Sequence, residues 1–218
     1  MFLIGPTRRL AIFLLSCLIS VGVVHAEPND DLLQAVLEQN VGDLNAALER
    51  GANVNATASN GSTALHIAVQ LNNLEIVTAL IAGNADTKIR AGNGGSVVYT
   101  AAVYAGIEIV DVLLAAGASS DVNVLSGGAT PLFVATQNND PEVALALMQA
   151  GADPNIKAAN GATVLMMASR NGYTDLVRSI IERGTDVNTS LQGITAIGLA
   201  KKRGHADIVT LLQEAGAN

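Results

Sequence analysis

The chain has 218 residues, of which 50% are apolar and only 3% aromatic, and its formal net charge is −7 at pH 7. Without Trp, its core must consist mainly of Ala, Leu, Ile and Val, which suit closely stacked helices better than one large globular interior. The negative balance disfavours nucleic acid and anionic membranes as ligands, because both are bound through Lys and Arg.

The segment 1–26 differs from the rest of the chain. Arg8 and Arg9 precede an apolar run from Leu10 to Val24, and small residues flank His25 before Glu27. A positive start, an apolar middle and a small-residue exit are typical of a secretory signal peptide, here cleaved after Ala26. The alternative is an uncleaved membrane anchor, although the run is shorter than the ~20 residues that span a bilayer. The pattern leaves open whether the signal is of the Sec, twin-arginine or lipoprotein type.

Cleavage after Ala26 would change the chemistry of the chain. Ten Lys and Arg would remain against 19 Asp and Glu, a formal charge of −9. Cys17, the only Cys, would leave with the leader, so the remainder would have no disulfide and no Cys-based metal site. We expect a periplasmic protein without a stable membrane span, with secretion, or anchoring by an uncleaved leader, as alternatives.

A short motif recurs after the leader at a nearly constant period of about 33 residues. Asp30–Ala35 lies one such period before the first full copy. A Gly-Ala-Asn-like element recurs in phase, for example at Gly51 and Gly151, and amphipathic stretches such as Glu75–Ile81 lie between the two elements. Apolar residues at i, i+1, i+4 and i+5 of these stretches predict one face of a helix. The five motif copies are Thr63–Ala68, Ser96–Ala101, Thr130–Ala135, Thr163–Ala168 and Thr195–Ala200.

This pattern resembles the ankyrin repeat, whose signature is Thr-Pro-Leu-His-x-Ala at a period of about 33 residues. The resemblance covers about residues 28–218, although only Pro131 keeps the Pro and only His66 keeps the His. It implies an all-α solenoid of stacked helix-turn-helix units with short β-hairpin loops, which the family calls fingers. The domain would span residues 27–218, with about six repeats at 28–60, 61–93, 94–127, 128–160, 161–192 and 193–218.

Each motif position has a local physical task. The Thr or Ser that opens the motif is predicted to cap the first helix through its hydroxyl. The Gly that ends each repeat is predicted to adopt a left-handed conformation, and Asn84 replaces it once. Ala105 and Gly106 predict a shifted turn in the third repeat, and Gly42 within a second helix makes the first repeat the least regular. We expect left-handed turns between the two helices of the other repeats at Asn72, Asn139, Gly172 and Gly204.

The loops between repeats hold Asn-Gly and Gly-Gly pairs that predict tight turns, as at Asn60-Gly61 and Gly127-Gly128. Asn155 and Asn188 are expected to tie one finger to the next. The last repeat carries polar side chains on one side, as the end of a stack requires.

The sequence after the leader offers little catalytic chemistry. Its two His residues are predicted to be structural, with His66 bonding backbone between repeats and His205 exposed or capping a turn. Five acidic residues occupy one repeat position, where they favour the N-terminus of the second helix. We therefore expect no catalytic, cofactor-binding or metal-binding residues, and no enzyme. The five acidic residues are Glu75, Glu108, Glu142, Asp175 and Asp207.

The resemblance also implies where a partner would bind. In the ankyrin family the concave face is built from the fingers and the first helix of each pair. Contact positions lie seven and eight residues after the start of the motif. These positions carry Gln70, Leu71, Val103, Tyr104, Gln137, Asn138, Arg170, Asn171, Lys202 and Arg203. The corresponding finger positions carry Ser59, Asn60, Asn93, Ser126, Asn160 and Gln192.

This row of contact positions starts apolar and ends basic, which favours a partner that presents acidic groups. Tyr104 and Arg170 are the expected anchors, because Tyr and Arg are enriched at interface hot spots. We expect a monomeric protein-binding module that has no cofactor and does not bind nucleic acid. The alternative is an envelope scaffold or stress-protective protein without one tight partner.

Overall fold

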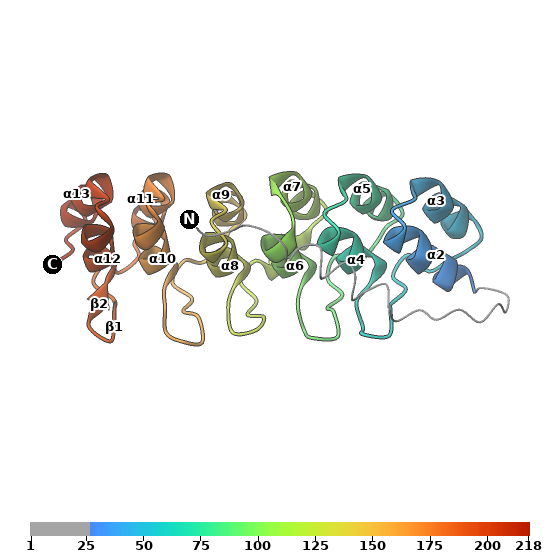
Figure 1. The fold of residues 1–218 in the computed structure, drawn as a ribbon, viewed down its shortest axis with the longest axis horizontal. Coiled ribbons are helices and arrows are strands. Elements are labelled where there is room, and N and C mark those ends of the chain that lie inside the picture. Colours follow the sequence, from blue (N-terminus) through green and yellow to red (C-terminus); the bar gives the residue numbers. More distant parts are fainter. Residues whose placement is uncertain (1–26) are drawn as a thin grey trace. The chain divides into compact units, whose positions relative to one another are not determined.

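The computed structural model describes residues 27–218, and the predicted leader lies outside the described residues. The chain forms two compact units, one ending at Asp86 and the other spanning Thr87–Asn218. In the first unit α2 packs against α3 and α4, and α5 packs against α3 and α4 (Figure 1). The helices of this unit are α2 (Pro28–Leu37), α3 (Val41–Glu49), α4 (Ala64–Gln70) and α5 (Leu74–Ala82).

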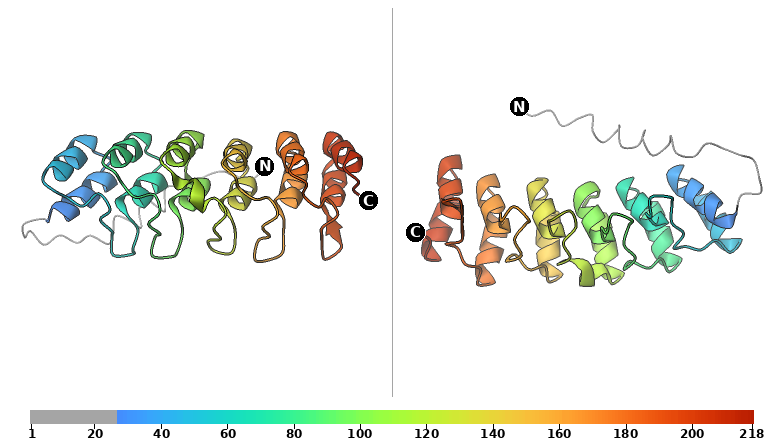
Figure 2. Two further views of the ribbon diagram at one scale, coloured as in Figure 1. Left: turned by 180° about the vertical axis from the view of Figure 1, so that it is seen from behind. Right: turned by 90° about the horizontal axis from the view of Figure 1, so that it is seen from below.

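The second unit contains four more helix pairs, a short 3₁₀ helix and one small hairpin. Its first helices, α6, α8, α10 and α12, lie side by side, and so do its second helices, α7, α9, α11 and α13 (Figures 1 and 2). The predicted all-α stack of helix-turn-helix units is therefore confirmed. The elements are α6 (Val97–Tyr104), α7 (Ile107–Ala115), η2 (Ala118–Asp121), α8 (Pro131–Gln137), α9 (Pro141–Gln149), α10 (Val164–Asn171), α11 (Thr174–Glu182), β1 (Ser190–Leu191), β2 (Ile194–Thr195), α12 (Ala196–Arg203) and α13 (Ala206–Glu214).

The core of each unit consists of small and aliphatic side chains, as the composition predicts. Large fully buried side chains include Leu44 and Leu80 in the first unit and Leu132 and Leu147 in the second. The Ala that closes each motif copy has no exposed surface, consistent with the close approach of neighbouring first helices. These residues are Ala68, Ala101, Ala135, Ala168 and Ala200.

The predicted caps are confirmed in all five motif copies. Each opening Thr or Ser accepts a hydrogen bond from the backbone N–H three residues later, which satisfies a donor that the helix leaves free. The first helix differs: α2 begins at Pro28, and Glu27 before it provides no side-chain cap. Gly42 lies within α3, but α3 has nine residues like α5 and α7, so the missing cap of α2 is the departure seen in the first helix pair.

The predicted turns between paired helices are also confirmed. Asn72, Asn139, Gly172 and Gly204 have positive φ angles between 54° and 86°, and Asn84 has φ of 65°. Between α6 and α7 the turn is different, because Ala105 is extended and Gly106 has φ of −89°. This is the shifted turn that the sequence predicts for that pair.

Most of the fingers have fewer paired backbone groups than the short β-hairpins that were predicted. One antiparallel hairpin joins β1 and β2, and the other described pairings are single bridges between Thr57 and Thr63 and between Ser126 and Ala129. Asn188 does tie neighbouring loops, because it donates to Gly216 O at 3.1 Å. The prediction for Asn155 is wrong: its amide donates to Asp153 of its own turn.

The sequence did not single out Asn123, which has the role expected of Asn155. Asn123 Oδ1 accepts the backbone N–H of Asp153 at 2.6 Å, and its amide donates to Gly151 O. Asn55 similarly accepts the N–H of Asp86 at 2.8 Å within the first unit. Within residues 27–218, none of the helices has the length and apolar character needed to cross a membrane.

Candidate functional site

The predicted partner-binding residues lie at the C-terminal ends of the first helices. Gln70 ends α4 and Leu71 follows it, and both are half-buried in the first unit. The other eight lie in the second unit, at the ends of α6, α8, α10 and α12. We call these eight the first-helix row: Val103, Tyr104, Gln137, Asn138, Arg170, Asn171, Lys202 and Arg203.

Six residues of the first-helix row are exposed, and Val103 and Asn171 are half-buried. Tyr104 is among the large apolar side chains that the fold leaves open, with 39% of its surface exposed. Because α6 packs on α8, α8 on α10 and α10 on α12, the helix ends that carry the exposed members follow one another along this layer (Figure 1). The remaining exposed members are Gln137, Asn138, Arg170, Lys202 and Arg203.

Two members of the row also have an internal role. Asn138 donates its amide to Ala102 O at 3.3 Å, and Asn171 donates to Thr136 O at 3.0 Å. Each amide thus binds a carbonyl near the end of the preceding first helix, where carbonyls lack intrahelical partners. These two residues hold neighbouring helices together, and they do so whether or not a partner is bound.

His205 continues this set of links. Its Nε2 lies 3.2 Å from Arg170 O, and the ring lies so close to Gly172 that an added β-carbon there would be 2.7 Å from Cε1. The sequence predicted a structural His205, either exposed or capping; it is half-buried and does not cap α13, but its ring pairs with a carbonyl in the last turn of α10. Its place just after Gly204 gave no sign of this contact.

One finger position is wrong as a candidate contact. Ser126 is only 7% exposed and pairs with Ala129 at the base of its turn. The other finger residues are exposed, but three Asn side chains stabilise their own turns by accepting a backbone N–H two residues later. The exposed finger residues are Ser59, Asn60, Asn93, Asn160 and Gln192.

No group of three or more His, Cys, Asp or Glu within residues 27–218 is arranged to hold a metal ion. His66 is 1% exposed, and its Nδ1 lies 2.8 Å from Thr63 Oγ1. Glu142 and Asp175 lie in the first turns of α9 and α11, where the helix dipole favours a negative charge. These groups therefore have structural explanations.

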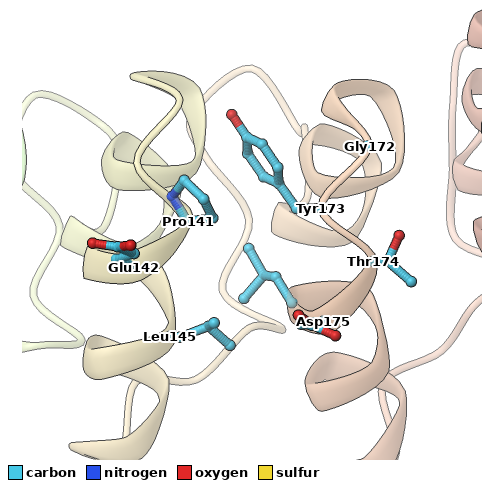
Figure 3. Close-up of a pocket in the computed structure, with 8 residues that line it drawn as sticks. Pro141, Glu142, Leu145, Gly172, Tyr173, Thr174 and Asp175 are labelled. Carbon is cyan, nitrogen blue, oxygen red and sulfur yellow. The ribbon is translucent and has the colours of Figure 1, made fainter.

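A shallow pocket of about 380 Å³ lies between the N-terminal halves of α9 and α11. Figure 3 shows Pro141, Glu142 and Leu145 on the α9 side, with Tyr173 and Asp175 on the other. Leu145 occupies a repeat position that holds Thr, Asp or Arg in the other second helices of this unit. The pocket is not apparent from the sequence, because its two walls come from separate helix pairs.

Tyr173, which lines the pocket, has a raised pKa. Its hydroxyl donates to Asn139 Oδ1 at 2.8 Å. Burial raises the pKa of Tyr173 above its usual 10.0, and Asp140 adds to this rise, while a hydrogen bond with Asn171 opposes it. The folded chain therefore holds this phenolic proton more tightly than the unfolded chain does.

We expect a matching loss of stability at high pH. Because the folded pKa is raised, the contribution of Tyr173 is fully present below pH 10.0 and disappears as pH rises through the folded pKa. Denaturant titrations of the wild type and Tyr173→Phe across this range measure it. The variant should lose less stability with rising pH; parallel curves for the two proteins would contradict the assignment.

Comparison with known proteins agrees with this architecture. A family model described as ankyrin repeats (3 copies) matches residues 26–126, 83–158 and 132–218. Among solved structures, an ankyrin repeat domain from Acinetobacter baumannii AYE is 28% identical, with a TM-score of 0.76. That match covers 86% of this chain and 98% of the other. No curated protein matches the chain significantly.

Proposed function

Because the chain belongs to the ankyrin-repeat family, we propose that it binds a partner protein through the first-helix row, in the periplasm. Ankyrin repeats generally mediate protein–protein interaction, and their fold is in general a non-catalytic scaffold. The resemblance to other ankyrin repeats implies that the row belongs to the concave surface that the family uses. Binding there requires no chemistry beyond the packing and polar contacts of its side chains.

The exposure of the row is the observation that supports this proposal. Gln137, Arg170, Lys202 and Arg203 project from helix ends whose backbones are fixed by packing on neighbouring helices. A rigid scaffold lowers the entropic cost of binding, because few groups must be ordered when the partner arrives. Side chains at the same helix ends, Asn138 and Asn171, supply that rigidity by bonding to the preceding helix.

The double variant Tyr104→Ala with Arg170→Ala tests this function. Truncating one aromatic or Arg anchor commonly costs about 2 kcal/mol or more, or about 30-fold in affinity, so we expect the double variant to lower partner capture by more than this. Capture is measured by cross-linking in envelope fractions followed by mass spectrometry, and circular dichroism should be unchanged. Arg178→Ala with Thr210→Ala, on the second helices α11 and α13, is the matched control. Undiminished capture by the Tyr104/Arg170 variant would exclude the row as the binding surface.

The same experiment separates the main proposal from a scaffold or stress-protective role. One stoichiometric cross-linked partner supports a dedicated binding module. Many weak partners, each insensitive to the double variant, would support the scaffold.

The proposed compartment has its own test. If the leader is removed after Ala26, the protein recovered from a bacterial host's periplasmic fraction should begin at Glu27. Mass spectrometry of the intact protein measures this end. Recovery only from the membrane fraction with residues 1–26 retained would favour the anchored alternative, and recovery from the cytoplasm would contradict export.

A further inference from the structure

We infer that the partner segment lying over α10 and α12 is an acidic stretch of polypeptide, an inference that rests on the proposed function. In the second unit, the charges of the two helix layers differ in sign. The first helices α6, α8, α10 and α12 contain no Asp or Glu, and α10 and α12 contribute one and three basic residues. The second helices α7, α9, α11 and α13 contain seven acidic residues and one basic residue.

The four basic residues are close together at one end of this unit. Arg170 lies in the last turn of α10, and Lys201, Lys202 and Arg203 form the last turn of α12. Because α10 packs directly on α12, the last turns that carry these residues belong to neighbouring helices, and we call the four residues the basic end. All four side chains are exposed, so their charges are open to a partner.

The basic end is not used to hold the fold together. The ion pairs of Arg50 with Asp31 and of Arg90 with Asp121 do not involve the basic end. The contact of Arg170 with the next helix pair is made by its backbone carbonyl, which lies 3.2 Å from His205 Nε2, and its side chain is exposed.

Other cations in this unit have different surroundings. Arg183 donates to the carbonyls of Met148 and Ala152, so it stabilises the end of α9. Arg178 lies on α11 within about one turn of Asp175 and Glu182, which offset its charge. The basic end lacks such neighbours on its own helices, and Asp207, the next acidic residue along the chain, lies on α13.

Carboxylates are the groups that this cluster suits best. Arg forms two parallel hydrogen bonds with one carboxylate, and Lys adds a point charge. Nucleic acid is disfavoured, since the chain outside the leader carries 19 acidic residues against ten basic ones and only four of these form the cluster. Neighbouring helices pack about 8–10 Å apart, so an extended segment of about eight residues would reach from Tyr104 to Lys202.

Two synthetic peptides test this inference against protein purified from cells that express the full chain. Both are octapeptides with Leu at one end; the other end carries four Glu in one peptide and four Gln in the second. We expect the Glu peptide to bind about tenfold more tightly by fluorescence anisotropy at low salt, with the difference shrinking as salt rises. The double variant Arg170→Glu with Lys202→Glu should lose this preference. It should bind a third octapeptide, with four Lys in place of the four Glu, more tightly than the Glu peptide.

The matched control is Arg178→Glu with Lys157→Glu, which changes the net charge equally away from the basic end. It should keep most of the preference for the Glu peptide. Equal binding of the Glu and Gln peptides, equal loss in the control, or tighter binding of a single-stranded oligonucleotide or anionic vesicles would overturn the inference. None of these results would affect the partner capture that tests the proposed function, so the two failures are distinguishable.

Discussion

Leu147→Ala should lower the free energy of unfolding by about 2–5 kcal/mol, which is the range for removing a large aliphatic side chain from a packed interior. Leu147 is fully buried in α9, which packs against α7, α8 and α11. Because each helix pair of a stack depends on its neighbours for burial, the loss should extend to the flanking pairs. Urea denaturation followed by circular dichroism measures the change.

Leu145→Ala is the matched control on the same helix. Leu145 is half-buried at the pocket between α9 and α11, so the same truncation removes less contact there and should cost about 1 kcal/mol. Equal losses for the two variants would contradict the burial pattern of α9.

Gly128→Ala should cost about 2–4 kcal/mol, which makes it the most sensitive loop substitution that we expect. Gly128 has φ of +82°, a conformation that costs an Ala about 1 kcal/mol or more. An added β-carbon would also lie 2.7 Å from Ala159 Cβ in the neighbouring loop, so one loop must move. That movement would strain the 2.7 Å hydrogen bond from Ala159 N to Gly128 O. Chemical denaturation reports the loss.

Gly151→Ala separates backbone strain from the clash. Gly151 has φ of +96°, but an added β-carbon would meet nothing within 4 Å. This control should therefore cost only about 1–2 kcal/mol, the backbone part of the effect. If it destabilised the protein as much as Gly128→Ala does, close approach of the loops would not explain the sensitivity of Gly128.

The sequence predicted those features that depend on residues near each other in the chain. A capping Thr such as Thr63 acts on a backbone group three residues away, and a left-handed residue such as Asn84 acts on its own turn. The repeat period then extends these local results along the chain. Fold class, caps and turns were predictable for this reason.

Features that depend on contacts between loops were predicted less well. Ser126 and the exposed Ser59 each lie four residues before the Thr that opens the next motif, yet Ser126 is buried. Asn155 and Asn188 share a repeat position, but Asn155 turns back to Asp153. The pocket beside Tyr173 and the contact between His205 and Arg170 likewise join separate helix pairs. A repeat alignment gives the position of each residue but not the rotamer that its neighbours select.

The charge difference between the two helix layers depends partly on local sequence and partly on contacts between helix pairs. Each acidic residue at the start of a second helix has a local explanation through the helix dipole. The absence of acidic residues from α6, α8, α10 and α12 is readable from the sequence once the helix bounds are known. The packing of α10 on α12 then brings Arg170 near the cations of α12.

Site-specific photo-crosslinking in the native compartment tests the binding surface most directly. A photoreactive amino acid would replace Gln137, at the centre of the first-helix row, and in a second variant Thr210, exposed on α13. We predict one prominent cross-linked partner protein from position 137 and little or none from position 210. Strong capture from position 210 together with none from position 137 would contradict binding through the first-helix row.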